Sequence, residues 1–161
     1  MKVIFLDIDG VLNGHEFDKL ARSCIIKTEC VRQFNRIVDA TSAKVVVSSA
    51  WRYMMLRTDD SEPAMTVRGF EYMLRTHGTH CDVIGHTRSD EDMGWNEHDN
   101  PRVRGKLIRR WLAEHGGEVK RYVTLDDDTD EVLLSLPFVK INGSIGLTEA
   151  DADRAIEILA D

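Results

Sequence analysis

Two aspartates near the amino terminus carry the strongest chemical signal in the chain. Asp7 and Asp9 come directly after the apolar residues 3–6 and directly before Gly10. Because side chains alternate along a strand, two acids separated by one residue leave the end of a strand on the same side. Carboxylates held so close repel each other unless a cation lies nearby. The pattern therefore predicts a divalent metal site, and a donor set made only of oxygens favours Mg²⁺.

Three later segments carry groups that complement these acids. A run of valines ends in the hydroxyls of Ser48 and Ser49, and a later apolar run ends in a second acidic pair, Asp126 and Asp127. Between them, a predicted helix begins with the cationic segment 104–106. Metal-binding acids, a hydroxyl and a cation are the groups that can position a phosphate ester and stabilise the phosphoryl group during transfer.

These four segments, in this order, resemble the four motifs of the haloacid dehalogenase (HAD) superfamily of phosphotransferases, over nearly the whole chain. The resemblance implies that Asp7 is a nucleophile that forms an aspartyl-phosphate, and that Asp9 acts first as general acid and then as general base. It also implies that Mg²⁺ is held by the carboxylates of Asp7 and Asp127 and by the backbone carbonyl of Asp9. Asp126 would help to hold or orient the metal.

The groups expected to contact the phosphate leave alternatives open. Ser48, the first hydroxyl after the valine run, is favoured as the donor to a phosphate oxygen, with Ser49 as its rival. Either serine could instead cap a following helix. Lys106 is preferred as the catalytic cation that neutralises the phosphate and the Asp7 carboxylate, and Arg104 is the alternative.

Three further residues are assigned supporting positions. Arg52 could reach a substrate phosphate or could lie at the surface over an aromatic ring. Gly10 is grouped with the substrate-binding residues. Asp130 is expected either to support the metal site or to cap a helix.

The elements that must position these groups alternate between strands and helices. Strands are predicted at residues 2–6, 44–48, 81–85, 121–125 and 138–141, and helices at residues 28–40, 65–76 and 104–115 and after Thr148. This alternation predicts a three-layer α/β, Rossmann-like fold around a central parallel sheet of about five strands. Ligands bind at the carboxyl ends of the strands in such sheets, where the acids and serines are expected.

The length and the hydrophobic content suit one domain. The 161 residues are 42% hydrophobic, enough to bury a core in a single unit that spans residues 1–161. Residues 13–28 have room for a flap hairpin but not for a folded cap, so the resemblance implies a capless member with an open site. Residues 51–101 have the weakest pattern, with loops expected at 59–63 and 89–100, and whether they close over the site is left open.

Charge and cysteine content limit the partners and the cellular location that the sequence predicts. Asp and Glu outnumber Lys and Arg by 28 to 21, and the net charge of −7 argues against a general nucleic-acid-binding surface, although local basic patches remain compatible with it. Three cysteines without a CxxC pair indicate no disulfide framework and favour a cytoplasmic location. The sequence has neither a membrane-length apolar run nor a signal-peptide pattern, and it gives no oligomeric state.

The leading functional prediction is a Mg²⁺-dependent phosphomonoesterase. Residues 48–52, 125–128 and 145–151 look most like a small capless HAD branch associated with RNA-repair proteins, which makes a polynucleotide 3′-phosphatase one hypothesis. A nucleotide, sugar or other small phosphate ester is the alternative substrate. A receiver-like binding module controlled by phosphorylation also combines acids, a hydroxyl and a lysine on a parallel sheet. Its phosphorylated aspartate lies on a middle strand, however, and Asp9 suits hydrolysis better than a lasting signal.

Overall fold

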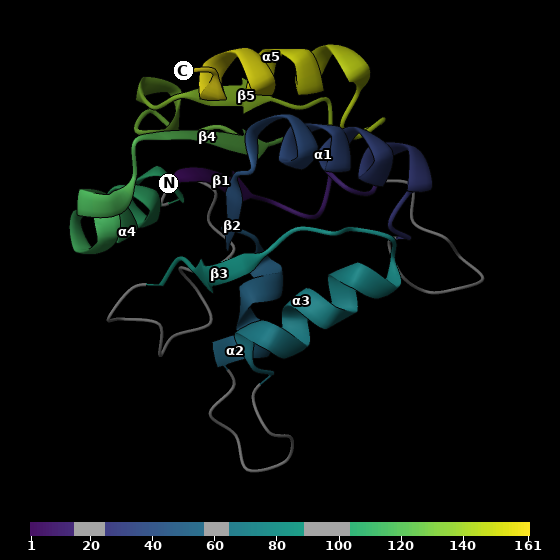
Figure 1. Ribbon diagram of the computed structural model, residues 1–161, viewed down its shortest axis with the longest axis horizontal. Coiled ribbons are helices and arrows are strands. Elements are labelled where there is room, and N and C mark those ends of the chain that lie inside the picture. Colours follow the sequence, from purple (N-terminus) through teal and green to yellow (C-terminus); the bar gives the residue numbers. More distant parts are fainter. Residues whose placement is uncertain (15–24, 57–64, 89–103) are drawn as a thin grey trace.

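A five-stranded parallel sheet forms the centre of the protein (Figure 1). The computed structural model describes residues 1–14, 25–56, 65–88 and 104–161. The strands are β1 (Lys2–Leu6), β2 (Lys44–Val47), β3 (Val83–His86), β4 (Arg121–Asp126) and β5 (Phe138–Lys140). Their spatial order is β3-β2-β1-β4-β5, and every neighbouring pair is parallel. The predicted three-layer α/β fold with about five parallel strands is thus confirmed.

Helices cover both faces of the sheet. The helices longer than one turn are α1 (Thr28–Thr41), α3 (Val67–Thr76), α4 (Arg104–His115) and α5 (Glu149–Leu159). Helices α1 and α5 contact each other on one face, and Figure 1 shows them side by side. On β1, Ile4 belongs to the core beneath α1, α3 and α5, whereas Phe5 belongs to the core beneath α4. The alternation of side chains on a buried strand therefore supplies both hydrophobic layers.

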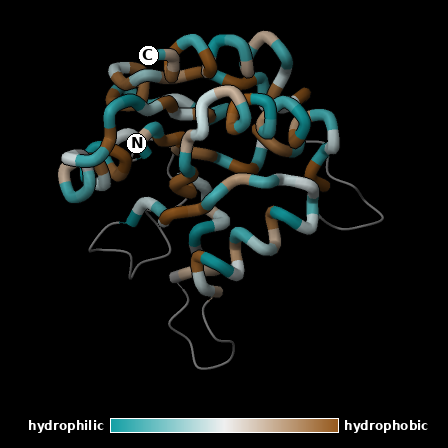
Figure 2. The backbone as a smooth tube through the Cα atoms, viewed as in Figure 1, coloured by the Kyte–Doolittle hydropathy of each residue, from teal (hydrophilic) through white to brown (hydrophobic). Residues whose placement is uncertain are grey.

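The sequence explains where the helices lie and begin. Helix α1 buries Val31, Phe34 and Ile37, which recur at helical spacing. Thr148 caps α5 in a capping box, in which its side chain accepts a hydrogen bond from the Asp151 N–H while the Asp151 carboxylate accepts one from the Thr148 N–H. Figure 2 shows that the hydrophobic residues concentrate in the central strands and on the inward sides of the helices.

The structure shifts some predicted boundaries and adds one feature. Helix α3 begins at Val67 rather than at residue 65, because the Thr66 hydroxyl caps it by accepting a hydrogen bond from the Gly69 N–H. Strand β3 begins at Val83 rather than at residue 81, and its pairing with β2 is irregular between Val83 and Gly85. A short 3₁₀ turn, η1 (Ala50–Arg52), and the single-turn helix α2 (Tyr53–Leu56) follow β2 and were not predicted.

Several predictions fall outside the described residues. These are the loops at 59–63 and 89–100 and most of the flap at 13–28. Within the parts that are described, no folded cap covers the sheet, and none of the helices has the length and apolar character needed to cross a membrane. Cys30 and Cys81 are free thiols, and Cys24 lies outside the described ranges.

Candidate active site

The register of the three central strands brings the predicted residues together. The last residue of β1 is paired with the last residue of β2 and with Leu125 of β4, and the residues that follow are Asp7, Ser48 and Asp126. The ladder continues, since the Asp7 N–H donates to the Leu125 carbonyl at 3.0 Å and the Ser48 N–H donates to the Leu6 carbonyl at 2.8 Å. Parallel pairing therefore places two acids and a hydroxyl in one row at the carboxyl edge of the sheet.

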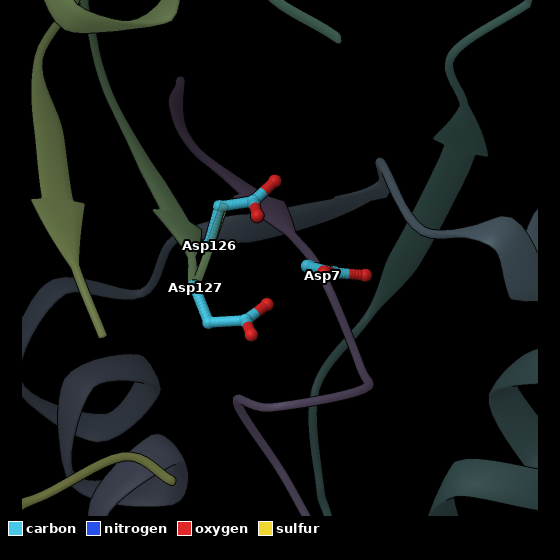
Figure 3. Close-up of side chains that lie close together, drawn as sticks. All are labelled: Asp7, Asp126 and Asp127. Atoms are coloured by element: carbon cyan, nitrogen blue, oxygen red, sulfur yellow. The ribbon is translucent and has the colours of Figure 1, made fainter. Parts of the chain in front are cut away.

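Three carboxylates form a cluster at this edge. One oxygen each from Asp7, Asp126 and Asp127 lies within 4.8 Å of the others, and Figure 3 shows the three side chains gathered at the ends of β1 and β4. We call these residues the acid cluster. Asp7 and Asp126 are buried, whereas Asp127 is partly exposed. Such a set of oxygens fits a hard divalent cation such as Mg²⁺.

The side chain of Asp9 lies outside this cluster. Its Oδ1 accepts a hydrogen bond from Asn13 Nδ2 at 2.8 Å, and its Oδ2 accepts one from the indole Nε1 of Trp51, also at 2.8 Å. Both oxygens are thereby oriented by neutral donors. Only the backbone carbonyl of Asp9 was expected to bind metal, and this placement is compatible with that prediction.

Gly10 gives the loop after β1 its shape. Its φ of +75° is unfavourable for other residues, and a Cβ at this position would lie 2.4 Å from Cγ of Asp127. The Gly10 N–H donates to Asn13 Oδ1 at 2.8 Å. This N–H therefore already has a partner, and Gly10 packs against the acid cluster, while its grouping with the substrate-binding residues stays a prediction.

Arg104, the first residue of α4, reaches into the acid cluster. Its Nη1 lies 2.5 Å from Asp7 Oδ2 and 2.6 Å from Asp126 Oδ2. Lys106 is exposed on the same helix and has no contact with the acid cluster within the described part of the chain. Side chains two residues apart on a helix do not share a face, so only one of the two cations can point at the acids. Sequence reasoning ranked them in the opposite order.

Asp130 fixes the start of α4. Its Oδ2 accepts a hydrogen bond from the Gly105 N–H at 2.9 Å, and its Oδ1 accepts one from the Leu133 N–H at 2.6 Å. A Cβ on Gly105 would lie 2.5 Å from the Leu133 nitrogen, so glycine permits the close approach of the helix to this loop. Of the two predicted alternatives for Asp130, the structure shows the helix cap, which also positions Arg104.

The two serines have different surroundings. The Ser49 hydroxyl forms a hydrogen bond with the Asp7 carboxylate and accepts one from the Trp51 N–H at 3.3 Å. The Ser48 hydroxyl is buried, and it has no hydrogen-bond partner among the described residues. A buried hydroxyl without a partner is costly, and at the carboxyl edge of the sheet the Ser48 hydroxyl is free to donate to a ligand.

Arg52 is a buried residue and not the surface residue that one prediction described. Its side chain is 1% exposed, and its Nη1 donates to the Ser49 carbonyl at 2.8 Å. It therefore supports the turn that carries the serines. Sequence reasoning assigned no site role to Trp51 or Asn13, the two donors to Asp9. The signal for Trp51 was its indole N–H, which needs an acceptor when it is partly buried.

Comparison with known protein families adds an independent finding. The model of the family described as the HAD domain in Swiss Army Knife RNA repair proteins matches residues 3–152. The chain belongs to this family. Comparisons with curated proteins and with solved structures gave no significant match. The matched range includes every site residue described above, and it confirms the resemblance stated from the four sequence motifs.

Burial raises the pKa values of two acids of this HAD domain, and repulsion by Asp7 adds to the effect at Asp126. Burial raises the pKa of the Asp7 carboxyl, although the charge of Arg104 and hydrogen bonds that include one from Ser49 act in the opposite direction. Burial, together with the negative charge of Asp7, raises the pKa of Asp126 to about 7. Burial disfavours the charged form of Arg104, but the two carboxylates outweigh it and hold the pKa of Arg104 above its usual range.

The charge balance of the site is suited to a divalent cation. The acid cluster and Arg104 carry a formal charge of −2 when all three carboxylates are ionised, three negative charges against one positive. HAD domains generally depend on a metal, and these residues provide the oxygen ligands for one. A bound cation would favour the ionised form of Asp7 and Asp126 and so oppose the effect of burial.

Proposed function

We propose that this HAD domain, spanning residues 1–161, is a Mg²⁺-dependent phosphomonoesterase in which Asp7 is the nucleophile and Asp9 transfers the proton. The observation that carries this proposal is the different placement of the two acids. Asp7 belongs to the acid cluster and faces Arg104, while Asp9 is held outside it by Asn13 and Trp51. One carboxylate is thus positioned among charged groups, and the other stays available for proton transfer.

Substrate binding would use donors that the site already presents. Ser48 would donate its hydroxyl to a phosphate oxygen and so gain the partner that it lacks in the structure. The guanidinium of Arg104 has five N–H donors, and its described hydrogen bonds use Nη1 only. The remaining donors of Arg104 can therefore bind a phosphate oxygen while its charge stays close to Asp7.

The reaction would proceed in two displacements. The Asp7 carboxylate attacks phosphorus, the bond from phosphorus to the leaving oxygen breaks, and Asp9 gives its proton to that oxygen. Asp9, now a carboxylate, takes a proton from the water that attacks the aspartyl-phosphate, which releases inorganic phosphate and restores Asp7. Mg²⁺ bound by Asp7, Asp127 and the Asp9 carbonyl, with Asp126 in support, would neutralise negative charge on the phosphoryl group.

The substrate we propose is the 3′-phosphorylated end of a polynucleotide. The family to which the chain belongs is described from RNA repair proteins, and an edge of the sheet without a folded cap over it, in the described parts, can admit the end of a large molecule. Turnover is favoured over a lasting phospho-signal because Asp9 lies two residues after the nucleophile and is oriented through both of its oxygens.

Phosphate release tests this proposal directly. The substrates are 3′- and 5′-phosphorylated oligonucleotides, mononucleotides and sugar phosphates, each with Mg²⁺ and with EDTA as the control. We expect metal-dependent release from 3′-phosphorylated ends, and loss of that release in Asp7→Asn but not in Asp153→Asn, which changes an exposed carboxylate on α5. Preference for a small ester would contradict the proposed substrate. Full activity of Asp7→Asn would contradict the mechanism.

A further inference from the structure

An open hollow lies beside the acid cluster at the end of β5. It has a volume of about 500 Å³ and is lined by Asp127, Asp128 and residues 140–144. Asp127 belongs both to the hollow and to the acid cluster, so a molecule whose phosphate lies at the acid cluster has direct access to the hollow. Apart from Asp127, the mechanism proposed above uses none of the residues that line the hollow.

One cation of the hollow is held close to the acid cluster. The exposed Lys140 donates a hydrogen bond from Nζ to the backbone carbonyl of Asp127 at 2.9 Å. Lys140 is the last residue of β5 and is paired with Asp126 on β4, which explains why its side chain reaches this edge. A lysine ammonium has three N–H donors, and this hydrogen bond uses one of them.

A second lysine, Lys27, lies close to the turn at residues 142–144 that lines the hollow. The turn is ordered by a hydrogen bond from the Ser144 N–H to Asn142 Oδ1 at 3.1 Å. A Cβ built on Gly14 would lie 2.5 Å from Nζ of Lys27 and 2.8 Å from the Ser144 carbonyl, so the Lys27 ammonium and this turn approach each other closely around Gly14. Lys140 therefore lies two residues before this turn in sequence, and Lys27 lies close to it in space.

We propose that this hollow binds the nucleotide that carries the reacting 3′-phosphate, and that Lys140 pairs with the phosphodiester on its 5′ side, with Lys27 farther along the strand. The inference rests on the proposed function, because it assumes that the reacting phosphate lies at the acid cluster.

The charges of the hollow decide which part of the nucleotide lies where. Asp128 lines the hollow and is exposed, so a phosphate placed against it would be repelled. The uncharged ribose and base suit this space, where the exposed side chains of Asn142 and Ser144 offer hydrogen-bonding groups. The phosphodiester is then expected to bind the lysines, which carry the positive charge. Two local cations would let a protein of net charge −7 bind a nucleic-acid end without a long basic surface.

Two substrates that differ only in the second phosphate test the subsite. One is a short single-stranded oligonucleotide with a 3′-phosphate, and the other is a nucleoside 3′-phosphate, which has no phosphodiester. We expect Lys140→Ala to lower kcat/KM for the oligonucleotide by about tenfold and to leave the mononucleotide within about twofold of the original protein. Lys27→Ala should give a smaller loss with the same selectivity. Lys120→Ala, which removes an exposed lysine just before the amino end of β4, away from the carboxyl edge that holds the site, should change neither rate.

Binding of a product decides the inference even without turnover. The oligonucleotide that ends in a 3′-hydroxyl can be labelled and followed by fluorescence anisotropy at several salt concentrations. We expect Lys140→Ala to reduce the slope of log affinity against log salt by about one, as the loss of one phosphate contact would. An unchanged slope would overturn the subsite, and so would an equal loss of rate on both substrates. Failure of the original protein to hydrolyse any 3′-phosphate would instead contradict the proposed function.

Discussion

The two acids at the end of β1 lie in contrasting surroundings. Asp7 is buried at the end of a central strand and contacts a charged partner, Arg104, at 2.5 Å. Asp9 is partly exposed, and its partners are the neutral side chains of Asn13 and Trp51. Two residues of the same type, separated by one position, therefore have different electrostatic environments.

In the mechanism that we propose, this difference separates a fixed charge at Asp7 from a movable proton at Asp9. The surroundings of Asp7 come from the register of three strands and from the cap that holds α4, so its geometry is set by the core of the protein. Those of Asp9 come from residues of the segments that follow β1 and β2. Preorganised charge benefits from a rigid frame, whereas a proton-transfer group must reach two different oxygens during one turnover.

Exchange of Asp7 or Asp9 for the corresponding amide should have the largest effect on turnover. We expect Asp7→Asn to lower turnover by at least about a thousandfold and to abolish the phospho-enzyme, because the nucleophile is lost. Asp9→Asn should also slow turnover, but the phospho-enzyme should accumulate, because its hydrolysis lacks a base. Acid quenching with a ³²P-labelled substrate measures both species. A phospho-enzyme in Asp7→Asn would refute the assignment of the nucleophile.

Removal of the positively charged side chain of Arg104 should have the next largest effect on turnover. We expect Arg104→Ala to lower kcat/KM by about a hundredfold, because the phosphate and Asp7 lose the positive charge between them. Lys106→Ala should stay within about twofold, because an exposed charge outside the site contributes little. The two variants are matched, since both residues lie in the first turn of α4. A larger loss for Lys106→Ala would reverse the assignment.

The relation of these two residues shows what the sequence could predict. The buried face of α4 includes Leu107 and Ile108, and both were predicted from their spacing. Arg104 lies three and four residues before them and therefore shares their face, whereas Lys106 does not. The helical period thus already indicated that Arg104, and not Lys106, would lie against the acids, and the motif resemblance alone did not.

Other parts of the site were predictable for a simpler reason. Apolar runs that end in polar residues mark the carboxyl ends of buried parallel strands, and this pattern is enough to locate Asp7, Ser48 and Asp126 at one edge of the sheet. The contacts of Asp9 with Asn13 and Trp51 were not predictable in this way, because they depend on how two loops pack against each other. The same holds for Lys140, whose position depends on the pairing of β5 with β4.

The pH dependence of stability should report the titration of the buried acid Asp126. The pKa of Asp126 is raised from 3.8 to about 7 in the folded protein, so the folded state binds more protons than the unfolded state between these values. In EDTA, this group should therefore make the protein less stable as the pH rises from about 4 to about 7. Mg²⁺ should oppose that loss, because it binds the ionised carboxylates and stabilises the folded state.

Thermal unfolding across this pH range, with EDTA and with Mg²⁺, measures the effect. Asp126→Asn should flatten the pH dependence of Tm in EDTA. A metal-free protein whose Tm rises steadily from pH 4 to 7, in the original and in Asp126→Asn alike, would contradict the role of the buried acids.

The smallest expected effect concerns the orientation of Asp9. Trp51→Phe keeps an aromatic ring but removes the N–H that donates to Asp9 Oδ2. We expect kcat to fall by about tenfold with little change in KM, as the loss of one hydrogen bond to a charged group would give. Tyr72→Phe, at a residue that is 71% exposed on α3, is the aromatic control and should be neutral.

A leaving group that needs no proton isolates this effect. With p-nitrophenyl phosphate as substrate, p-nitrophenolate leaves as an anion and needs no proton from Asp9. The burst of p-nitrophenolate that accompanies phosphorylation of Asp7 should therefore keep its rate in Trp51→Phe. Hydrolysis of the aspartyl-phosphate, which needs Asp9 as base, should slow. Equal slowing of the burst would mean that Trp51 supports the acid cluster. The separation between the surroundings of Asp7 and of Asp9 would then not extend to catalysis, because the loss of one indole N–H would impair both acids together.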